Sequence, residues 1–457
     1  MNWQDFSGKK IALLGAGIEN IALIPHLIRA KAEVAICNRE ETPATDKLKQ
    51  DGHKLIIGEN YLDGLDYYDY VFRIAGMPTA TLESAIRDLA KKPIITSPTD
   101  LFLSLRPCHI IGVTGTKGKG TTSTFIGSIL KAAGKQVFVI GNIGRPIFEI
   151  YDELTQDSYA VVELSSFQLE DVHSSPEIAV VLPITEDHLQ PVSVANPNFH
   201  PSIEHYRAAK ANITAYQEAT DLLVYAADSE ATANIAEGSG ARKIGVGTKS
   251  GDLLVSELGA LSSDGKTLID LKQVGLRGEH IFLNAGVAIA VAREIGCNEV
   301  NIEQGLIDFR PLPHRMEKFA VHDGRTFVDD SYATNPTAAM AALTAFTEPV
   351  ILLAGGINND VDFKIFAERV TKSSVKAVVL IGREADKIKH DLETANFSGS
   401  IIMSDTFEEA VKNAVANSSA GDVVLLSPAC KSFDMFKNAT ERGNEFQRLV
   451  TNLYANS

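Results

Sequence analysis

The segment IIGVTGTKGKGTTST, residues Ile110–Thr124, decides the fold of the chain. An apolar run ends here in a turn rich in glycine and threonine, and the next residues, FIGSILKAAG, are apolar at helical spacing. Strand, loop and helix in this order predict a phosphate-binding element, because glycines let the backbone wrap around a phosphate and the helix N-terminus offers free N–H groups. The loop supplies Gly115, Thr116, Lys117, Gly118, Lys119, Gly120 and Thr121.

This loop departs from the common nucleotide-binding pattern G-x-x-x-x-G-K-[ST]. Val113 stands at the first glycine position, and Gly120 stands where a hydroxyl residue should follow Lys119. The hydroxyls come one residue later, from Thr121 onward. A surface turn rich in glycine and lysine is the alternative interpretation, but the order of strand, loop and helix favours a nucleotide site.

Length and composition indicate a globular chain of several domains. The 457 residues suggest about three domains, and the net charge of −15 argues against nucleic acid as a partner. The first residues lack the pattern of a signal peptide, and no apolar run approaches the length of a membrane span. The cysteines form no CxxC pair, which fits free thiols in a reducing cytosol. A cytoplasmic location, away from membranes, is therefore expected.

The residues before the phosphate loop predict a βαβ opening. KIALLGAG and EVAICN read as strands with a helix between them. Gly15 and Gly17 suggest a dinucleotide fingerprint, but its third glycine is replaced by Asn20, and Cys37 occupies the place of the ribose-binding acid. The pattern is thus a weak signal for NAD and favours a Rossmann-like turn with another role. LFLSLRPCH looks like the connection out of this domain, which we expect to span residues 1–107.

The central part continues with apolar runs that read as parallel strands, YAVVELSSFQLE and IAVVLPITEDHL. Ligands bind beyond the carboxyl ends of such strands, so Glu163 and Asp187–His188 are expected to face the phosphate loop, where a carboxylate can hold the magnesium of ATP. Lys210 lies in a helical stretch, where periodicity alone predicts a solvated side chain. FRPLPHRME reads as a linker, which bounds this domain to residues 108–311, and a further βα series fills 312–457.

The fold class that follows is α/β with three domains: a Rossmann-like first domain, a central parallel sheet of the P-loop ATPase kind, and a Rossmann-like last domain. The ordered motifs VTGTKGKGTT, GNIG, VVELSSFQLE, ITEDH, HYRAAK, LNA, LPHRME, DDSYATNP and SPACKSFDMFKNATERGNEF then make the chain recognisable. Together they resemble the Mur ligase family over essentially the whole chain. The closest match is to the members that add D-glutamate.

The resemblance implies an enzyme that adds D-glutamate to UDP-N-acetylmuramoyl-L-alanine in peptidoglycan precursor synthesis. ATP and two Mg²⁺ ions are implied, with an acyl-phosphate intermediate. The chain is expected to act as a monomer on small-molecule substrates. The first domain would bind the UDP end, the central one ATP, and the last one glutamate.

Residue roles carry over by position. Residues 115–121 would cradle the phosphates, with Lys119 as the point charge. Glu163, Thr121, His188 and a carbamylated Lys210 would surround the metals, which replaces the solvated interpretation of Lys210. Asn284, Arg315 and Asp330 would contact the nucleotide. The UDP-linked substrate would meet Asn38, Arg39, Asn142, Ser165 and Gln168, and glutamate would meet Ser432 and the backbone near Ala439.

Several positions depart from the family pattern. Gly120 replaces a hydroxyl residue, Ile281 replaces an asparagine, and Ile74–Gly76 replaces an SPG turn. Tyr332 and Asn359 stand where the D-glutamate-adding members commonly have lysines. A charge-assisted bond to a carboxylate contributes about 1.5–3 kcal/mol, so losing two should matter unless other residues replace them.

These departures leave alternatives open. L-glutamate or another acidic amino acid could be the incoming substrate. A second alternative is a nucleotide-binding protein that has lost catalysis, motivated by Gly120 and Ile281. A folylpolyglutamate synthetase would share the phosphate loop but gives no reason for ELSSFQLE or RGNEF.

Overall fold

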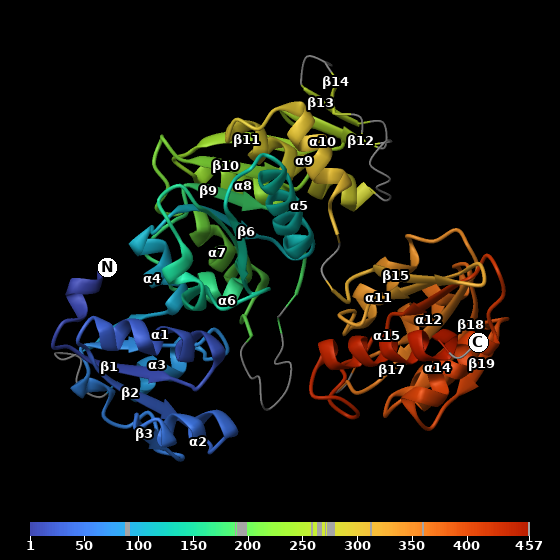
Figure 1. Cartoon of the computed structure of the whole chain (residues 1–457), viewed down its shortest axis with the longest axis horizontal. Helices are drawn as coiled ribbons and strands as arrows, with labels where there is room; N and C mark the ends of the chain where they lie inside the picture. The colour runs from blue at the N-terminus through green and yellow to red at the C-terminus, as the bar shows by residue number, and fades with distance from the viewer. Residues whose placement is uncertain are drawn as a thin grey trace. The chain divides into compact units, whose positions relative to one another are not determined.

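A computed structural model describes residues 1–86, 92–187, 189, 199–256, 259–262, 267–269, 271, 279–310, 313–358 and 361–455. The chain forms two compact units, Met1–Phe309 and Arg310–Ser457. Figure 1 shows the three sheets on which these units are built, two in the first unit and one in the second. The predicted α/β class with three sheets is confirmed.

The first sheet has five parallel strands in the order β3-β2-β1-β4-β5. The order reverses between β1 and β4, and ligands bind at such a switch point in open α/β sheets. The strands are β1 (Lys10–Leu14), β2 (Glu33–Asn38), β3 (Lys54–Ile57), β4 (Tyr70–Phe72) and β5 (Ile94–Thr96). The helices are α1 (Ile18–Arg29), α2 (Pro43–Gln50), α3 (Thr79–Ala85) and α4 (Pro98–Leu105), with 3₁₀ turns η1 (Trp3–Phe6) and η2 (Leu65–Tyr67).

Helix α4 corrects the prediction that LFLSL belongs to the connection out of the first domain. Ser97 caps this helix by accepting a hydrogen bond from the Asp100 N–H, and Pro98 stands at its first turn. Its side chains from Leu101 to Leu103 are fully buried. The chain therefore leaves the first sheet through a packed helix that ends at Leu105.

The second sheet has nine strands in the order β14-β13-β12-β11-β10-β9-β6-β8-β7. It is parallel up to β12, and an antiparallel extension of β13 and β14 was not predicted. The strands are β6 (His109–Thr114), β7 (Val137–Gly141), β8 (Tyr159–Glu163), β9 (Ile178–Val181), β10 (Leu222–Ala226), β11 (Arg242–Gly247), β12 (Leu253–Ser256), β13 (Gly259–Ser262) and β14 (Thr267–Ile269). The helices are α5 (Lys119–Ala132), α6 (Ser166–Leu169), α7 (Ile203–Ala211), α8 (Glu230–Gly238), α9 (Glu279–Glu294) and α10 (Glu299–Ile307), with 3₁₀ turns η4 (Ile147–Glu149), η5 (Tyr151–Glu153) and η6 (Asn212–Thr214).

The long strand predicted for YAVVELSSFQLE is wrong in its second half. The strand β8 stops at Glu163, and the short helix α6 follows. The Ser165 hydroxyl accepts from the Gln168 N–H, while the Gln168 side chain accepts from the Ser165 N–H. This reciprocal cap turns the chain into a helix at the carboxyl end of the strand.

The second unit holds a six-stranded sheet in the order β15-β16-β20-β17-β18-β19, in which only the β15–β16 pair is antiparallel. The strands are β15 (Glu317–His322), β16 (Arg325–Asp329), β17 (Val350–Gly355), β18 (Val375–Ile381), β19 (Ser400–Met403) and β20 (Val423–Leu426). The helices are α11 (Pro336–Leu343), α12 (Lys364–Thr371), α13 (Ala385–Thr394), α14 (Phe407–Ala416) and α15 (Ala439–Ala455).

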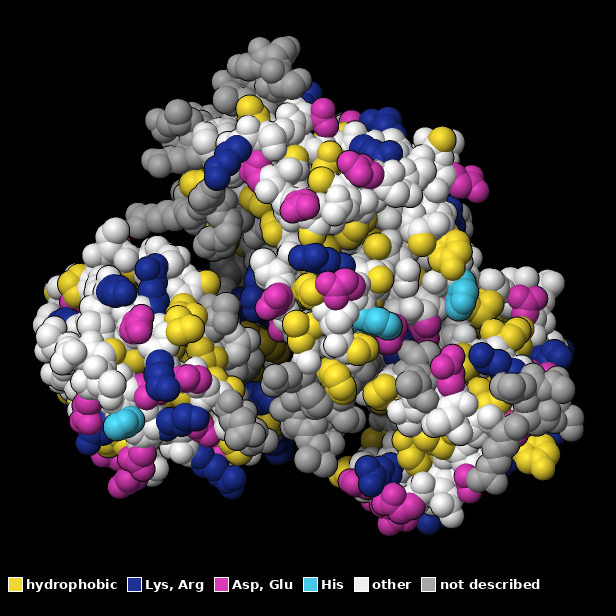
Figure 2. All heavy atoms as spheres, turned by 180° about the vertical axis from the view of Figure 1, so that it is seen from behind, with side chains coloured by type: hydrophobic (Ala, Val, Ile, Leu, Met, Phe, Trp, Pro, Cys, Tyr) yellow, Lys and Arg dark blue, Asp and Glu magenta, His cyan; other side chains and the backbone are white. Residues whose placement is uncertain are grey.

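The distribution of charged side chains on the surface and the burial of the cysteines are two further features of the fold. Figure 2 shows acidic and basic side chains interspersed over the visible face. Within the described ranges, no helix is long and apolar enough to cross a membrane. All four cysteines are described, and they are buried free thiols: Cys37, Cys108, Cys297 and Cys430. Burial raises the pKa of Cys108 and of Cys430 to about 12.

Candidate functional site

The phosphate loop joins β6 to α5 as predicted. Gly115 and Gly118 have φ angles of 146° and 84°, in the region that favours glycine. A Cβ at Gly118 would lie 2.5 Å from Asn284 Oδ1, and one at Gly115 would lie 2.6 Å from Leu182 Cβ. A side chain at either position would collide with Asn284 or Leu182, so the close turn of this loop requires glycine at both positions.

Two lysines converge on one carbonyl of this loop. Lys119 Nζ donates to the Gly115 and Thr116 carbonyls at 3.1 Å each. Lys210 Nζ donates to the same Gly115 carbonyl at 2.9 Å. The predicted phosphate lysine and the predicted carbamate lysine thus lie beside the same backbone atom.

Lys210 is 1% exposed, which contradicts the solvated side chain that its helical periodicity predicted. Burial, and then the nearby Lys119, hold the pKa of Lys210 well below its usual value, while Asp187 and Glu163 act in the opposite direction. Its ammonium lies over the ring of Tyr206, 4.7 Å from the centroid. Burial therefore disfavours the charged ammonium relative to an exposed lysine, and the neutral amine is the form that can react as a nucleophile.

Tyr206 was not predicted as a site residue. Its hydroxyl lies 3.0 Å from the Thr116 hydroxyl, so it holds the phosphate loop as well as Lys210. The signal was available, because Tyr206 precedes Lys210 by four residues on α7 and such pairs share one helix face.

Glu163 ends β8 next to the loop and is 3% exposed. Asn142 Nδ2 donates to Glu163 Oε1 at 3.2 Å, and the Asn142 N–H donates to the Glu163 carbonyl at 2.9 Å. A buried carboxylate at the end of the strand next to β6 is the kind of oxygen ligand that a hard cation such as Mg²⁺ prefers, and Thr121 stands in the first turn of α5, which follows the same loop. Lys210 fits such a donor set only as a carbamate, because an amine that donates to Gly115 offers no oxygen.

Four further predicted residues of the first unit have structural partners. Asn38 Oδ1 accepts from the Ala16 N–H at 3.0 Å, which ties the end of β2 to the Gly15 turn. Arg39 is exposed and pairs with Glu59 at 3.3 Å. Ser165 and Gln168 cap α6, so part of the polar capacity attributed to substrate is used in the fold. His188 lies outside the described residues.

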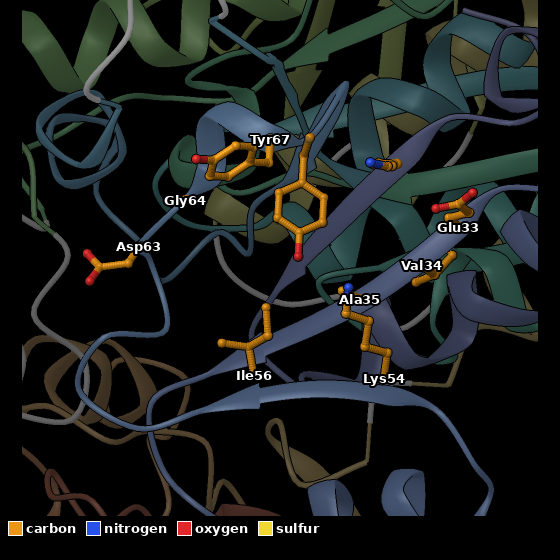
Figure 3. A pocket seen from close by; sticks show the side chains of 10 residues that line it. Glu33, Val34, Ala35, Lys54, Ile56, Asp63, Gly64 and Tyr67 are labelled. Atoms are coloured by element: carbon orange, nitrogen blue, oxygen red, sulfur yellow. The ribbon is translucent and has the colours of Figure 1, made fainter.

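A cavity of about 800 Å³ is separate from these residues. Figure 3 shows that Glu33, Val34, Ala35, Lys54, Ile56 and Tyr67 line it. It lies at the amino ends of β1 and β2, whereas Asn38 is the last residue of β2 and Gly15 directly follows β1.

In the second unit, Arg315 lies over the ring of Tyr332, with its guanidinium carbon 4.8 Å from the centroid. The Tyr332 hydroxyl lies 2.9 Å from the Thr440 hydroxyl. Tyr332, which replaces an expected lysine, thus serves as a stacking platform for a predicted nucleotide contact. Ser432 is 2% exposed, and Asn359 lies outside the described residues.

A buried hydrogen-bond network involves His314 and Asp329, the sequence neighbours of Arg315 and Asp330. Within the described segments, His314, Glu317 and Asp329 form a group whose ligand atoms lie within 4.8 Å of one another. His314 Nδ1 is 2.7 Å from Asp329 Oδ2, and this bond raises the pKa of His314. Gln447 Nε2 donates to Glu317 and Asp329 at 3.0 Å each, which indicates a structural hydrogen-bond network rather than a metal site.

Asp330 is 7% exposed and accepts hydrogen bonds from Ser427 Oγ at 2.8 Å and the Met316 N–H at 3.2 Å. Burial raises its pKa to about 7 from 3.8. Between these values the folded protein keeps a proton that the unfolded chain has lost, so raising the pH lowers the free energy of unfolding.

We predict that Asp330→Asn removes this pH dependence. The wild type should lose up to a few kcal/mol of stability between about pH 4 and pH 8 from this residue, and the variant should lose correspondingly less. Urea unfolding followed by circular dichroism at several pH values measures the difference. Parallel curves for the two proteins would contradict the raised pKa.

Comparison with known proteins gives a consistent result. Residues 113–292 match the family described as Mur ligase middle domain, and residues 314–430 match the Mur ligase, glutamate ligase domain. A UDP-N-acetylmuramoylalanine–D-glutamate ligase of Clostridium kluyveri is 35% identical over 471 residues, covering 99% of both chains. Ligases of the same name from Clostridium novyi and Symbiobacterium thermophilum are each 34% identical, over 99% and 97% of this chain.

Solved structures agree on the fold. The UDP-N-acetylmuramate–alanine ligase MurC of Thermotoga maritima has a TM-score of 0.63 at 20% identity and covers 97% of this chain and 100% of its own. The MurF ligase of Thermotoga maritima in complex with ADP has a TM-score of 0.59 at 18% identity, covering 99% of this chain and 97% of its own.

Proposed function

The chain belongs to the Mur ligase family, and we propose that it catalyses the ATP-dependent addition of D-glutamate to UDP-N-acetylmuramoyl-L-alanine. The observation that carries the proposal is the convergence of Lys119 and Lys210 on the Gly115 carbonyl, with Glu163 close enough to act on Lys210 electrostatically. A protein that only binds nucleotide has no need for a buried second lysine next to a carboxylate. The names of the curated relatives favour D-glutamate over the alternatives.

In the proposed reaction, the substrate carboxylate attacks the γ-phosphate of ATP and ADP leaves. The amine of glutamate then attacks the resulting acyl phosphate, loses a proton and expels phosphate. Two anions meet in the first step, so cations must neutralise them. The N–H groups of residues 115–121 and Lys119 would hold the transferred phosphate.

Two magnesium ions are proposed as the resident metals. Glu163 and Thr121 would hold one, and the carbamate of Lys210 with His188 would hold the other. Bound Mg²⁺ would neutralise the phosphate charge and polarise the γ-phosphate. These carboxylate, carbamate and hydroxyl groups offer the oxygen ligands that Mg²⁺ prefers.

The remaining roles follow the proposed domains, 1–107, 108–311 and 312–457. Asn284, Arg315 and Asp330 would bind the nucleotide, and Ser432 would bind the glutamate side chain. A larger set would hold the UDP-linked substrate: Asn38, Arg39, Asn142, Ser165 and Gln168. The proposed enzyme is a monomer of the cytoplasm, where its ATP is supplied.

An amino-acid panel tests the function. With UDP-N-acetylmuramoyl-L-alanine and Mg·ATP, phosphate release is expected with D-glutamate. The value of kcat/KM for L-glutamate or D-aspartate should be at least about 100-fold lower than that for D-glutamate. A factor of 100 corresponds to about 2.7 kcal/mol, the size of one or two misplaced charge-assisted hydrogen bonds. Turnover with L-glutamate but not D-glutamate would reject the proposed substrate. ATP binding without stimulated hydrolysis would favour the degenerate nucleotide-binding protein.

A further inference from the structure

Arg73 follows β4 directly and is 1% exposed, yet it was not predicted as a functional residue. Its guanidinium makes a two-pronged pair with Asp171, Nε to Oδ2 at 2.5 Å and Nη2 to Oδ1 at 2.7 Å. Nη2 also donates to the Phe167 carbonyl at 2.8 Å, and Nη1 donates to the Met77 carbonyl at 3.1 Å. One buried side chain at the end of β4 therefore binds both the helix α6 and Asp171, two residues beyond the end of that helix.

Other contacts hold α6 from different directions. His200 stacks on Phe167 with ring centroids 4.7 Å apart, and its Nε2 lies 2.9 Å from Ser166 Oγ. Asn212 Nδ2 donates to the Leu169 and Glu170 carbonyls at 3.0 and 3.1 Å. A helix of four residues has little stability of its own, so these contacts decide where it lies. Arg73 is the described contact among them that comes from the first sheet.

The hydrogen bonds of Arg73 to Asp171 and to the Phe167 carbonyl, called the Arg73 clamp below, lie at a cavity of about 200 Å³ between the first sheet and α6. Arg73 and Ile74 line it from the turn after β4, Ile18 from the first residue of α1, and Phe167 and Gln168 from α6. The turns after β1 and β4 flank the switch point of the first sheet, where ligands of open α/β sheets bind. The cavity is thus shared by the parts of the chain proposed to hold the two ends of one substrate.

We infer that Arg73 is a positioning residue for the nucleoside-diphosphate sugar: through Asp171 and the Phe167 carbonyl it fixes α6, with Ser165 and Gln168, against the carboxyl end of β4. The inference rests on the proposed function and adds a residue to it. All of the hydrogen bonds of Arg73 are made to protein groups. Arg73 therefore acts on the substrate only by setting the distance between α6 and the turns of the first sheet, which form the two walls of the cavity. A misplaced wall weakens binding of the UDP-linked substrate without touching the phosphate loop.

The test is steady-state kinetics of Arg73→Met, Arg73→Lys and Asp171→Asn in the full chain. The methionine variant keeps an apolar stem but no donor, and the lysine variant keeps a charge without the fork. We expect KM for UDP-N-acetylmuramoyl-L-alanine to rise at least tenfold in Arg73→Met and by a smaller factor in Arg73→Lys. KM for ATP and kcat should stay within about threefold. Asp171→Asn should resemble Arg73→Met, and the double variant should be no worse than either single one.

Arg29→Met is the matched control. Arg29 pairs with Asp152 at 2.8 and 2.9 Å and also joins the first sheet's layer to the second, from α1 to η5. Its side chain is 63% exposed, and it does not line the cavity. KM for the UDP-linked substrate should be unchanged in this variant. The control therefore separates a general loss of an ion pair from loss of the clamp.

Two results would overturn the inference. One is an unchanged KM for the UDP-linked substrate in both Arg73→Met and Asp171→Asn, under conditions in which the wild-type enzyme turns over normally. The other is an equal rise in KM for ATP, which would indicate a general loss of structure. If Arg73→Met does not fold, Asp171→Asn and direct calorimetric titration of the UDP-linked substrate decide the question. Wild-type enzyme without turnover would instead refute the proposed function and this inference with it.

Discussion

Replacing Lys210 with alanine is expected to lower kcat at least about 1,000-fold, which corresponds to about 4 kcal/mol of lost transition-state stabilisation. Carbon dioxide adds to a neutral amine by forming an N–C bond, and one proton leaves, so a buried lysine with a lowered pKa is suited to carbamylation. The product carries the negative oxygens that the proposed second metal needs. Removing the side chain removes these oxygens and leaves a space beside Gly115.

Small carboxylates should partly restore activity to Lys210→Ala, because acetate or bicarbonate can place an oxygen anion in that space. Lys210→Arg is the control, since its guanidinium fills the space and forms no stable carbamate. It should be equally inactive, and acetate should not rescue it. Both effects are measured as phosphate release with and without acetate or bicarbonate at about 100 mM, at constant ionic strength. Full activity of Lys210→Ala in bicarbonate-free buffer would remove Lys210 from the mechanism.

Lys119→Met is expected to lower kcat by about 100- to 1,000-fold, the range for losing one preorganised donor to a developing charge. The side chain is half-buried and already lies along the loop, 3.1 Å from two of its carbonyls. It can reach a phosphate in the loop by rotating about its own stem. Binding of ADP should weaken less than turnover, because the backbone N–H groups remain.

Lys117→Met is the matched comparison within the same loop. The Lys117 side chain is exposed, and only its backbone is proposed to face a phosphate. The loss in kcat should therefore be less than tenfold. Equal losses in the two variants would mean that the loop needs positive charge in general rather than the Lys119 side chain.

Local patterns were sufficient for much of the fold. EVAICN was predicted as a strand and forms β2 over Glu33–Asn38. The phosphate loop was predicted from glycines that the structure uses at positive φ. These features depend on residues a few positions apart, and periodicity and turn chemistry report on that range.

Features that depend on residues far apart in the chain could not be predicted from local sequence patterns. The burial of Lys210 is created by the phosphate loop, 95 positions away at Gly115. No role was predicted for Arg73, because its partner Asp171 is 98 positions away in the sequence. The turn of β8 into α6 was missed for the opposite reason, since the apolar run masked a capping pair only three residues apart.

The burial of all four cysteines makes the protein a convenient starting point for fluorescence labelling. Thiolates react with maleimides and thiols do not, so inaccessible groups with raised pKa values stay unlabelled in the folded state. A cysteine introduced at the exposed end of α1 and another on α13 would then be the reactive pair, one in each unit. Dyes could then be attached to these two positions without first deleting any native thiol.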